Sequence, residues 1–264
     1  MQLVFGQPSV NLKSNILEVV VPKELEVNIP TGLPQVDILF AGDGVMPSTS
    51  ALVTGQPGLG KSTMMLQLAD SLTGQGHKVL YVAGEESLYQ IRKRIRSLEL
   101  KHGFIPSYDT GVMQVIANAK SLQKTAKKDQ RVFVIVDSLQ CLVLDEDNDT
   151  KSTKAKRGRP KKVDPTTRCI ELLTMWAKES FGVALMIGHV TKSGDFAGKN
   201  SLRHTLDCHL HFEVDTERRS ETYQQRIAIM KKNRTGISEQ YFPYEIGRTG
   251  LHFNLVAVAS DSEE

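Results

Sequence analysis

Gly55–Ser62 reads GQPGLGKS, and this stretch decides the fold of the 264-residue chain. The pattern GxxxxGK[ST] places glycine where the backbone must turn tightly and present its N–H groups to phosphate oxygens. Lys61 supplies a mobile charge for the outer phosphates, and Ser62 supplies a hydroxyl of the kind that Mg²⁺ takes as a ligand. The predicted phosphate-binding loop consists of Gly55, Gln56, Pro57, Gly58, Leu59, Gly60, Lys61, Ser62 and Thr63.

The setting of this loop separates it from an ordinary glycine-rich turn. An apolar run, SALVT at 50–54, precedes it, an amphipathic helix over 61–72 follows, and a second apolar run, KVLYVA, occupies 78–83. Strand, helix and strand in this order form a βαβ unit and imply a parallel sheet. The amino end of the helix adds its own attraction for anions. We therefore predict a nucleoside triphosphatase of the P-loop class.

The remaining pattern extends the same α/β architecture. We expect helices over 84–98 and 165–181, and strands over 113–117, 131–137 and 182–190. The pattern changes after Asp207, where four apolar runs separated by short turns predict antiparallel strands; they cover 208–215, 222–230, 238–246 and 250–258. The predicted fold class is α/β, with a mostly parallel central sheet flanked by helices and antiparallel strands at its C-terminal end.

Length and composition favour one ordinary globular domain. We expect the core over 26–258 with a polar insert at 144–164, an acidic tail at 259–264, and an extension over 1–25 that adds an edge strand or reaches a neighbouring subunit. No run approaches the ~20 apolar residues that span a bilayer, and the amino end lacks a signal-peptide pattern, so we expect a cytoplasmic protein. The three cysteines form no CxxC pair, which favours buried thiols over a zinc or disulfide site.

Carboxylates follow two of the predicted strands. Asp137 ends the apolar run RVFVIVD, where it can hold Mg²⁺ beside Ser62; a simple cap is the ordinary alternative. Glu85 and Glu86 follow the second strand, where one carboxylate can polarise the attacking water while the other caps the next helix. We favour Glu85 slightly. His189 ends a later strand and is either a sensor of the terminal phosphate or a histidine satisfied within the core.

Lys232 and Arg234 stand two residues apart in MKKNRTG, at the end of a predicted strand. Residues at i and i+2 of a strand point to the same face, so both charges project together. A solvated strand end is the plain interpretation. Because Lys61 already serves the loop of its own subunit, the second cationic pair makes most sense in a neighbour's nucleotide site, as an arginine finger supplied in trans. That arrangement requires a ring or filament.

Taken together, these blocks resemble the RecA-like ATPase core of the RadA/Sms family of bacterial DNA recombination proteins. The resemblance covers residues 31–236. The stretches that carry it are TGLPQVDILFAGDGVMPS, GQPGLGKST, YVAGEES, QIRKRI, VIVDSLQ, GHVTKSGDFAGKNSLRHTLDCHLHFE and KKNRTG.

This resemblance implies ATP hydrolysis coupled to single-stranded DNA, hexameric rings, and branch migration or unwinding during recombination, repair or replication. It assigns Lys61 and Ser62 to the phosphate loop, Asp137 to the Mg²⁺ site, and Lys232 and Arg234 to the KNRFG-type motif. Three departures accompany it: the sequence matches neither the family's four-cysteine zinc module nor its protease-like domain, and Thr235 replaces the phenylalanine of the motif. A phage-encoded or otherwise reduced bacterial relative fits these departures.

A basic segment interrupts the chain after the Asp137 strand. Residues 151–163 carry seven basic side chains and no acidic one, while the remainder of the chain has an acidic excess. KRGRPKK resembles an AT-hook, whose extended Arg-Gly-Arg-Pro core fits the minor groove of A·T-rich duplex. A solvated tether and a localisation signal are the alternatives. The candidate DNA contacts in this segment and in the later loop are Lys154, Lys156, Arg157, Arg159, Lys161, Lys162, Lys192, Lys199 and Arg203.

Three functions fit the sequence. The first is an ATP-driven DNA motor, the second a regulatory clock-type ATPase acting on protein partners, and the third a DNA-binding scaffold in which turnover is incidental. The basic segment favours the first and third, and the Glu85/Glu86 and Lys232/Arg234 pairs favour the first over the third.

Overall fold

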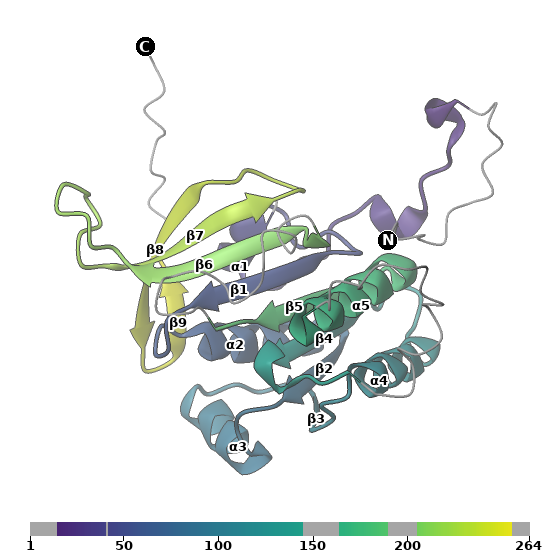
Figure 1. Cartoon of the computed structure of the whole chain (residues 1–264), viewed down its shortest axis with the longest axis horizontal. Coiled ribbons are helices and arrows are strands. Elements are labelled where there is room, and N and C mark those ends of the chain that lie inside the picture. Colours follow the sequence, from purple (N-terminus) through teal and green to yellow (C-terminus); the bar gives the residue numbers. More distant parts are fainter. Residues whose placement is uncertain (1–14, 41, 145–163, 190–204, 255–264) are drawn as a thin grey trace, which may run out of the picture.

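A computed structural model describes residues 15–40, 42–144, 164–189 and 205–254. Its centre is a nine-stranded sheet in the order β3-β2-β4-β5-β1-β6-β7-β8-β9 (Figure 1). The parallel strands are β1 (Ser50–Gly55), β2 (Lys78–Ala83), β3 (Ile105–Ser107), β4 (Val132–Asp137), β5 (Val183–Ile187) and β6 (Cys208–Val214). The antiparallel strands β7 (Arg226–Asn233), β8 (Gln240–Gly247) and β9 (Gly250–Phe253) extend the sheet beyond β6, which confirms the predicted fold class.

Helices cover both faces of the parallel part of the sheet. They are α1 (Pro34–Phe40), α2 (Lys61–Gly74), α3 (Leu88–Ser97), α4 (Val112–Lys124) and α5 (Pro165–Ser180). Side chains alternate along each strand, so Ala51 and Val53 of β1 join the core under α1, α2 and α3, while Leu52 joins the core under α4 and α5. The two apolar clusters pack the sheet between the helical layers.

The expected strand at 113–117 is wrong, because these residues belong to α4. Buried side chains of α4 recur at Val112, Val115, Ile116 and Ala119, which is the spacing of one helix face. A five-residue window is too short to reveal that period. The strand in this region is β3, which ends five residues before α4 begins.

The amino-terminal extension forms no edge strand within the part that the structure describes. Residues 15–25 contain two single turns of 3₁₀-helix, η1 (Ile16–Glu18) and η2 (Lys23–Leu25). Asn15 and Glu18 cap η1 reciprocally, which gives this backbone its hydrogen bonds without a neighbouring strand. The first extended pairing is an antiparallel bridge between Ile29 and Val45.

All three cysteines lie in the part of the chain that the structure describes. Cys169 and Cys208 are buried, Cys141 is partly buried, and none of the three forms a disulfide. Among the described residues, no helix is long and apolar enough to cross a bilayer.

Candidate functional site

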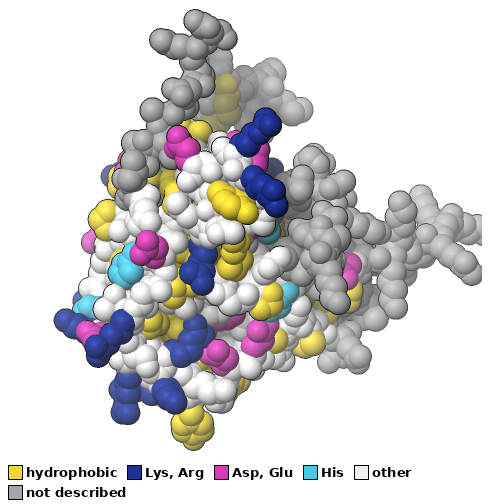
Figure 2. Space-filling view, turned by 90° about the vertical axis from the view of Figure 1, so that its left-hand side faces the viewer, with side chains coloured by type: hydrophobic (Ala, Val, Ile, Leu, Met, Phe, Trp, Pro, Cys, Tyr) yellow, Lys and Arg dark blue, Asp and Glu magenta, His cyan; other side chains and the backbone are white. Residues whose placement is uncertain are grey.

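The phosphate-binding loop connects β1 to α2 at the carboxyl edge of the parallel strands, the edge that faces the viewer in Figure 2. Gly60 precedes the first helical residue, Lys61, and has a left-handed backbone with φ of +88°. The Tyr244 hydroxyl on β8 donates a 2.7 Å hydrogen bond to the carbonyl of Leu59 and so anchors the loop from the antiparallel strands. The loop therefore presents the amino end of α2 to an incoming anion.

Lys61 is buried among the groups that surround this edge. Its ammonium donates to the carbonyls of Gly55 at 2.7 Å and Gln56 at 2.8 Å. Burial lowers the pKa of Lys61, and the nearby carboxylates of Asp137 and Glu85 partly oppose that effect. A lysine held in this way carries its charge across the mouth of the loop, where the outer phosphates of a nucleotide lie in P-loop proteins.

Asp137 ends β4 and lies beside the loop. Its Oδ2 accepts a 2.7 Å hydrogen bond from the Tyr81 hydroxyl, and Ser62 also donates to its carboxylate. Burial raises the pKa of Asp137 above its ordinary value, although the two hydrogen bonds act in the opposite direction. The carboxylate makes no cap. Its pairing with the Ser62 hydroxyl gives the oxygen ligand set that suits Mg²⁺.

Glu85 lies just beyond β2 and contacts residues from two neighbouring strand ends. His189, two residues beyond β5, places Nε2 2.7 Å from Glu85 Oε1, and the Ser138 hydroxyl donates to the same oxygen. Burial tends to raise the pKa of Glu85, but the hydrogen bonds from Ser138 and His189, together with the electrostatic attraction of His189 and Lys61, leave the pKa below its ordinary value. His189 is 36% exposed, so it is not a core histidine.

Glu86 has a different environment. Arg94 of α3 donates to both of its carboxylate oxygens, at 3.0 and 2.9 Å, and also to the Thr63 hydroxyl at 3.2 Å. Neither glutamate caps α3, because the Ser87 hydroxyl fills that role. Since Arg94 occupies Glu86, Glu85 is the carboxylate better placed to orient a water molecule.

Lys232 and Arg234 lie at the opposite ends of the strands, near the level at which β1 begins. Asn233, between them, ends β7 and pairs with Cys208, which pairs with Ala51 near the start of β1. Four residue steps along β1 separate Ala51 from Gly55, a span of about 13 Å at the usual rise per residue. Within one chain, the two cations are therefore remote from the phosphate loop.

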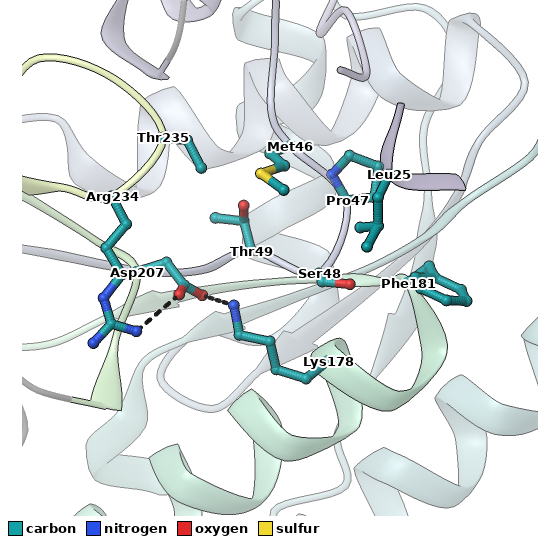
Figure 3. A pocket seen from close by; sticks show the side chains of 10 residues that line it. All are labelled: Leu25, Met46, Pro47, Ser48, Thr49, Lys178, Phe181, Asp207, Arg234 and Thr235. Atoms are coloured by element: carbon teal, nitrogen blue, oxygen red, sulfur yellow. Dashed lines mark hydrogen bonds and ion pairs between the residues drawn. The ribbon is translucent and has the colours of Figure 1, made fainter. Parts of the chain in front are cut away.

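Both cations contact the segment that leads into β6. Lys232 donates to the Leu206 carbonyl at 2.6 Å, and Arg234 NH1 lies 3.4 Å from Asp207 Oδ1. Thr235, which replaces the motif's phenylalanine, donates through its amide and its hydroxyl to the Asn233 side chain. Arg234, Thr235 and Asp207 line a cavity of about 360 Å³ (Figure 3).

Sequence reasoning missed three residues that complete these arrangements: Tyr81, Arg94 and Asp207. A hydroxyl inside the otherwise apolar strand KVLYVA was the available signal for Tyr81. Arg94 and Asp207 gave no separable signal, because each stands among other charged residues or at a strand start. The nine candidate DNA contacts lie outside the described residues, as do 1–14 of the extension and the acidic tail.

Comparisons with known proteins identify the family of the chain. A family model described as "ATPase: KaiC" matches residues 29–255. Two relatives are the DNA repair protein RadA of Listeria monocytogenes, 32% identical over 92% of this chain, and that of Mycobacterium tuberculosis, 34% identical over 85%. Those matches cover 48% and 42% of the relatives, so the chain spans about half of their length.

A solved structure supports the fold independently. The KaiC-like protein of Pyrococcus horikoshii superposes with a TM-score of 0.60 over 86% of this chain and 99% of its own, at 16% identity. The chain thus belongs to the KaiC family of ATPases, with the RecA-like core that it shares with RadA.

Proposed function

We propose that this protein is a DNA-dependent ATPase of recombination or repair whose nucleotide sites are shared between neighbouring subunits. The observation that carries the proposal is that Arg234 lies near the amino ends of the parallel strands, whereas Lys61 and Glu85 lie at their carboxyl ends. One chain cannot bring these groups to the same phosphate. Two neighbouring chains in a ring or filament can do so when the Arg234 end of one faces the phosphate loop of the next. A hexameric ring is the assembly we expect.

Each residue of the site then has a distinct task. The backbone of the loop and Lys61 bind the phosphates, and Ser62 and Asp137 hold Mg²⁺, whose charge offsets that of the phosphates. Glu85 orients and polarises the attacking water, with His189 next to it to respond to the terminal phosphate. Arg234, with Lys232 beside it, stabilises the charge that develops on the phosphate of the adjacent subunit.

Two observations support DNA as the proposed partner: the names of the relatives and the basic segment at residues 151–163. The relatives are named DNA repair proteins. Residues 151–163 concentrate seven positive charges, which suits the phosphate backbone of single-stranded DNA or of an A·T-rich duplex. Translocation or unwinding is the work that a ring of this kind would draw from ATP.

The amino-terminal extension is proposed as a subunit contact. Ile16, Leu17 and Val20 are 78–90% exposed, although they are apolar. Leu25, at the end of the same segment, lines the cavity beside Arg234. The segment thus leaves the domain at the edge that meets a neighbour in the shared site, where a second copy would cover its apolar side chains.

ATPase activity with and without single-stranded DNA, for wild type and Lys61→Ala, tests the function. We expect DNA to stimulate the wild type and Lys61→Ala to be inactive. Absence of stimulation would favour a regulatory ATPase that acts on protein partners. DNA binding with negligible turnover would favour a scaffold.

Subunit mixing tests the shared site. Arg234→Ala should bind ATP but not turn it over, and mixing it with Lys61→Ala should restore activity, because some interfaces then combine an intact loop with an intact Arg234. If no mixture regains activity, the shared site is wrong.

A further inference from the structure

Asp207 is a buried carboxylate whose contacts reach three separate elements. It is 4% exposed and precedes β6, and its Oδ2 accepts hydrogen bonds from the Ser50 amide and hydroxyl at 2.9 Å each and from Lys178 of α5 at 2.7 Å. Its Oδ1 faces Arg234 NH1 at 3.4 Å (Figure 3). We propose that Asp207 is the positioning residue that aims Arg234 at the nucleotide of the adjacent subunit; this rests on the proposed shared site.

The backbone geometry supports this role. The Arg234 amide donates to the Asp207 carbonyl at 3.0 Å, and the Asp207 amide donates to the Ser50 carbonyl at 2.9 Å. Main chain and side chain of Arg234 are thus both fixed to one residue, which is itself fixed to the first residue of β1. Arg234, directly after the end of β7, gains a defined orientation from these bonds, and orientation is what a transition-state contact requires.

The unequal distances to the two cations matter for the mechanism. A buried carboxylate needs a close cationic partner, and Lys178 at 2.7 Å provides it. The contact with Arg234 is longer, and the Arg234 side chain is 49% exposed. Asp207 therefore orients the guanidinium without burying it, beside a cavity of about 360 Å³.

A purely structural role is the competing explanation, because Asp207 also fastens β6 to the start of β1. Mixing experiments separate the two. If Asp207 acts through Arg234, Asp207→Asn damages only the half of the site that its subunit lends to a neighbour. If Asp207 acts through β1, the same substitution damages the phosphate loop of its own subunit.

The experiment measures ATP binding and turnover of Asp207→Asn, alone and in mixed oligomers. We expect near-normal ATP binding and a loss of turnover of about 10- to 100-fold, the scale expected when a catalytic group is misplaced by about 1 Å. Mixing with Lys61→Ala should restore activity, and mixing with Arg234→Ala should not. If mixing Asp207→Asn with Arg234→Ala restored activity, the proposal would be overturned, because Asp207 would then act on the phosphate loop of its own subunit.

Ser50→Ala is the matched control, since it removes one hydrogen bond to Asp207 and leaves the Arg234 contact. It should keep turnover close to wild type; a loss as large as that of Asp207→Asn would overturn the positioning role. Asp207→Glu, which keeps the charge and moves the carboxylate, serves in the same mixtures if Asp207→Asn does not fold. If the mixture of Arg234→Ala and Lys61→Ala regained no activity, that result would instead contradict the shared site itself.

Discussion

His189 Nε2 lies 2.7 Å from Glu85 Oε1, so that the residues following β5 and β2 meet over the end of β4. β4 lies between those two strands, and Ser138, directly after it, donates to the same carboxylate oxygen. Three strand ends thus converge on one carboxylate. His189 is the last described residue before the sequence segment that contains Lys192, Lys199 and Arg203.

His189→Ala should change the pH dependence of turnover. The hydrogen bond from His189 helps keep the pKa of Glu85 below its ordinary value, so its loss raises that pKa. The base is then ionised only at higher pH, and the acid limb of kcat shifts upward. We also expect kcat to fall about 10-fold at neutral pH, a fraction of the effect of a positioned general base.

His252→Ala provides the control for this substitution. His252 lies on β9 and bonds the Thr249 side chain, remote from Glu85 in the sheet. Its pH–rate profile should match that of the wild type. An unshifted acid limb in His189→Ala would show that the hydrogen bond has no influence on the catalytic base.

Tyr81→Phe should weaken Mg²⁺-dependent ATP binding, most of all at low pH. The Tyr81 hydroxyl is a donor that lowers the pKa of Asp137, which burial has raised. Without it that pKa rises further, and a larger fraction of the carboxylate is protonated as the pH falls. Mg²⁺ titrations of ATP binding at pH 6 and pH 8 should show a larger loss of affinity at pH 6.

Tyr241→Phe makes the same chemical change at a position that is 52% exposed on β8. It should leave Mg²⁺ affinity unchanged at both pH values. Equal losses at pH 6 and pH 8 in Tyr81→Phe would mean that the hydroxyl acts by packing and not through the ionisation of Asp137.

The sequence predicted the parts of the site that depend on local chemistry. The glycine loop, Asp137 and the two glutamates each follow a strand whose apolar pattern is readable without a structure. Parallel strands bring such positions to one edge, so their grouping followed from the fold class. The α/β arrangement was predicted for the same reason.

Features that depend on packing between distant segments were not predicted. Tyr81 contacts Asp137 across adjacent strands, and Asp207 contacts Ser50 across 157 residues of sequence. The different roles of Glu85 and Glu86 also depend on Arg94, which contacts Glu86. The sequence does not show toward which glutamate the Arg94 side chain points. The error at 113–117 came from choosing the strand period in a segment too short to distinguish it from a helix.

Gly55→Ala should destabilise the protein more than Gly58→Ala. Both glycines have positive φ, +139° and +80°, but a Cβ on Gly55 would lie 2.3 Å from the Phe212 carbonyl oxygen, whereas one on Gly58 would meet nothing within 4 Å. We expect losses in the free energy of unfolding of about 2–4 kcal/mol and about 1 kcal/mol respectively. Urea denaturation of the two variants measures them, and equal losses would contradict the steric argument.

Deleting residues 154–162 should weaken DNA binding and make it less sensitive to salt. The deletion removes six basic side chains. Each basic side chain that contacts a DNA phosphate releases counterions from the DNA, and this release makes binding sensitive to salt. For single-stranded DNA, the slope of log affinity against log salt concentration should fall by up to about 4 if all six make contact. Turnover without DNA should be unchanged, because the nucleotide groups lie elsewhere in the sequence.

A linker of glycine and serine with the same length, placed at 154–162, separates charge from chain length. It should reproduce the shallow salt slope of the deletion, since the positive charges are absent from both. An unchanged slope in both variants would mean that these residues do not touch DNA. A shallow slope in the deletion alone would mean that the length of the insert, and not its charge, controls access to the nucleic acid.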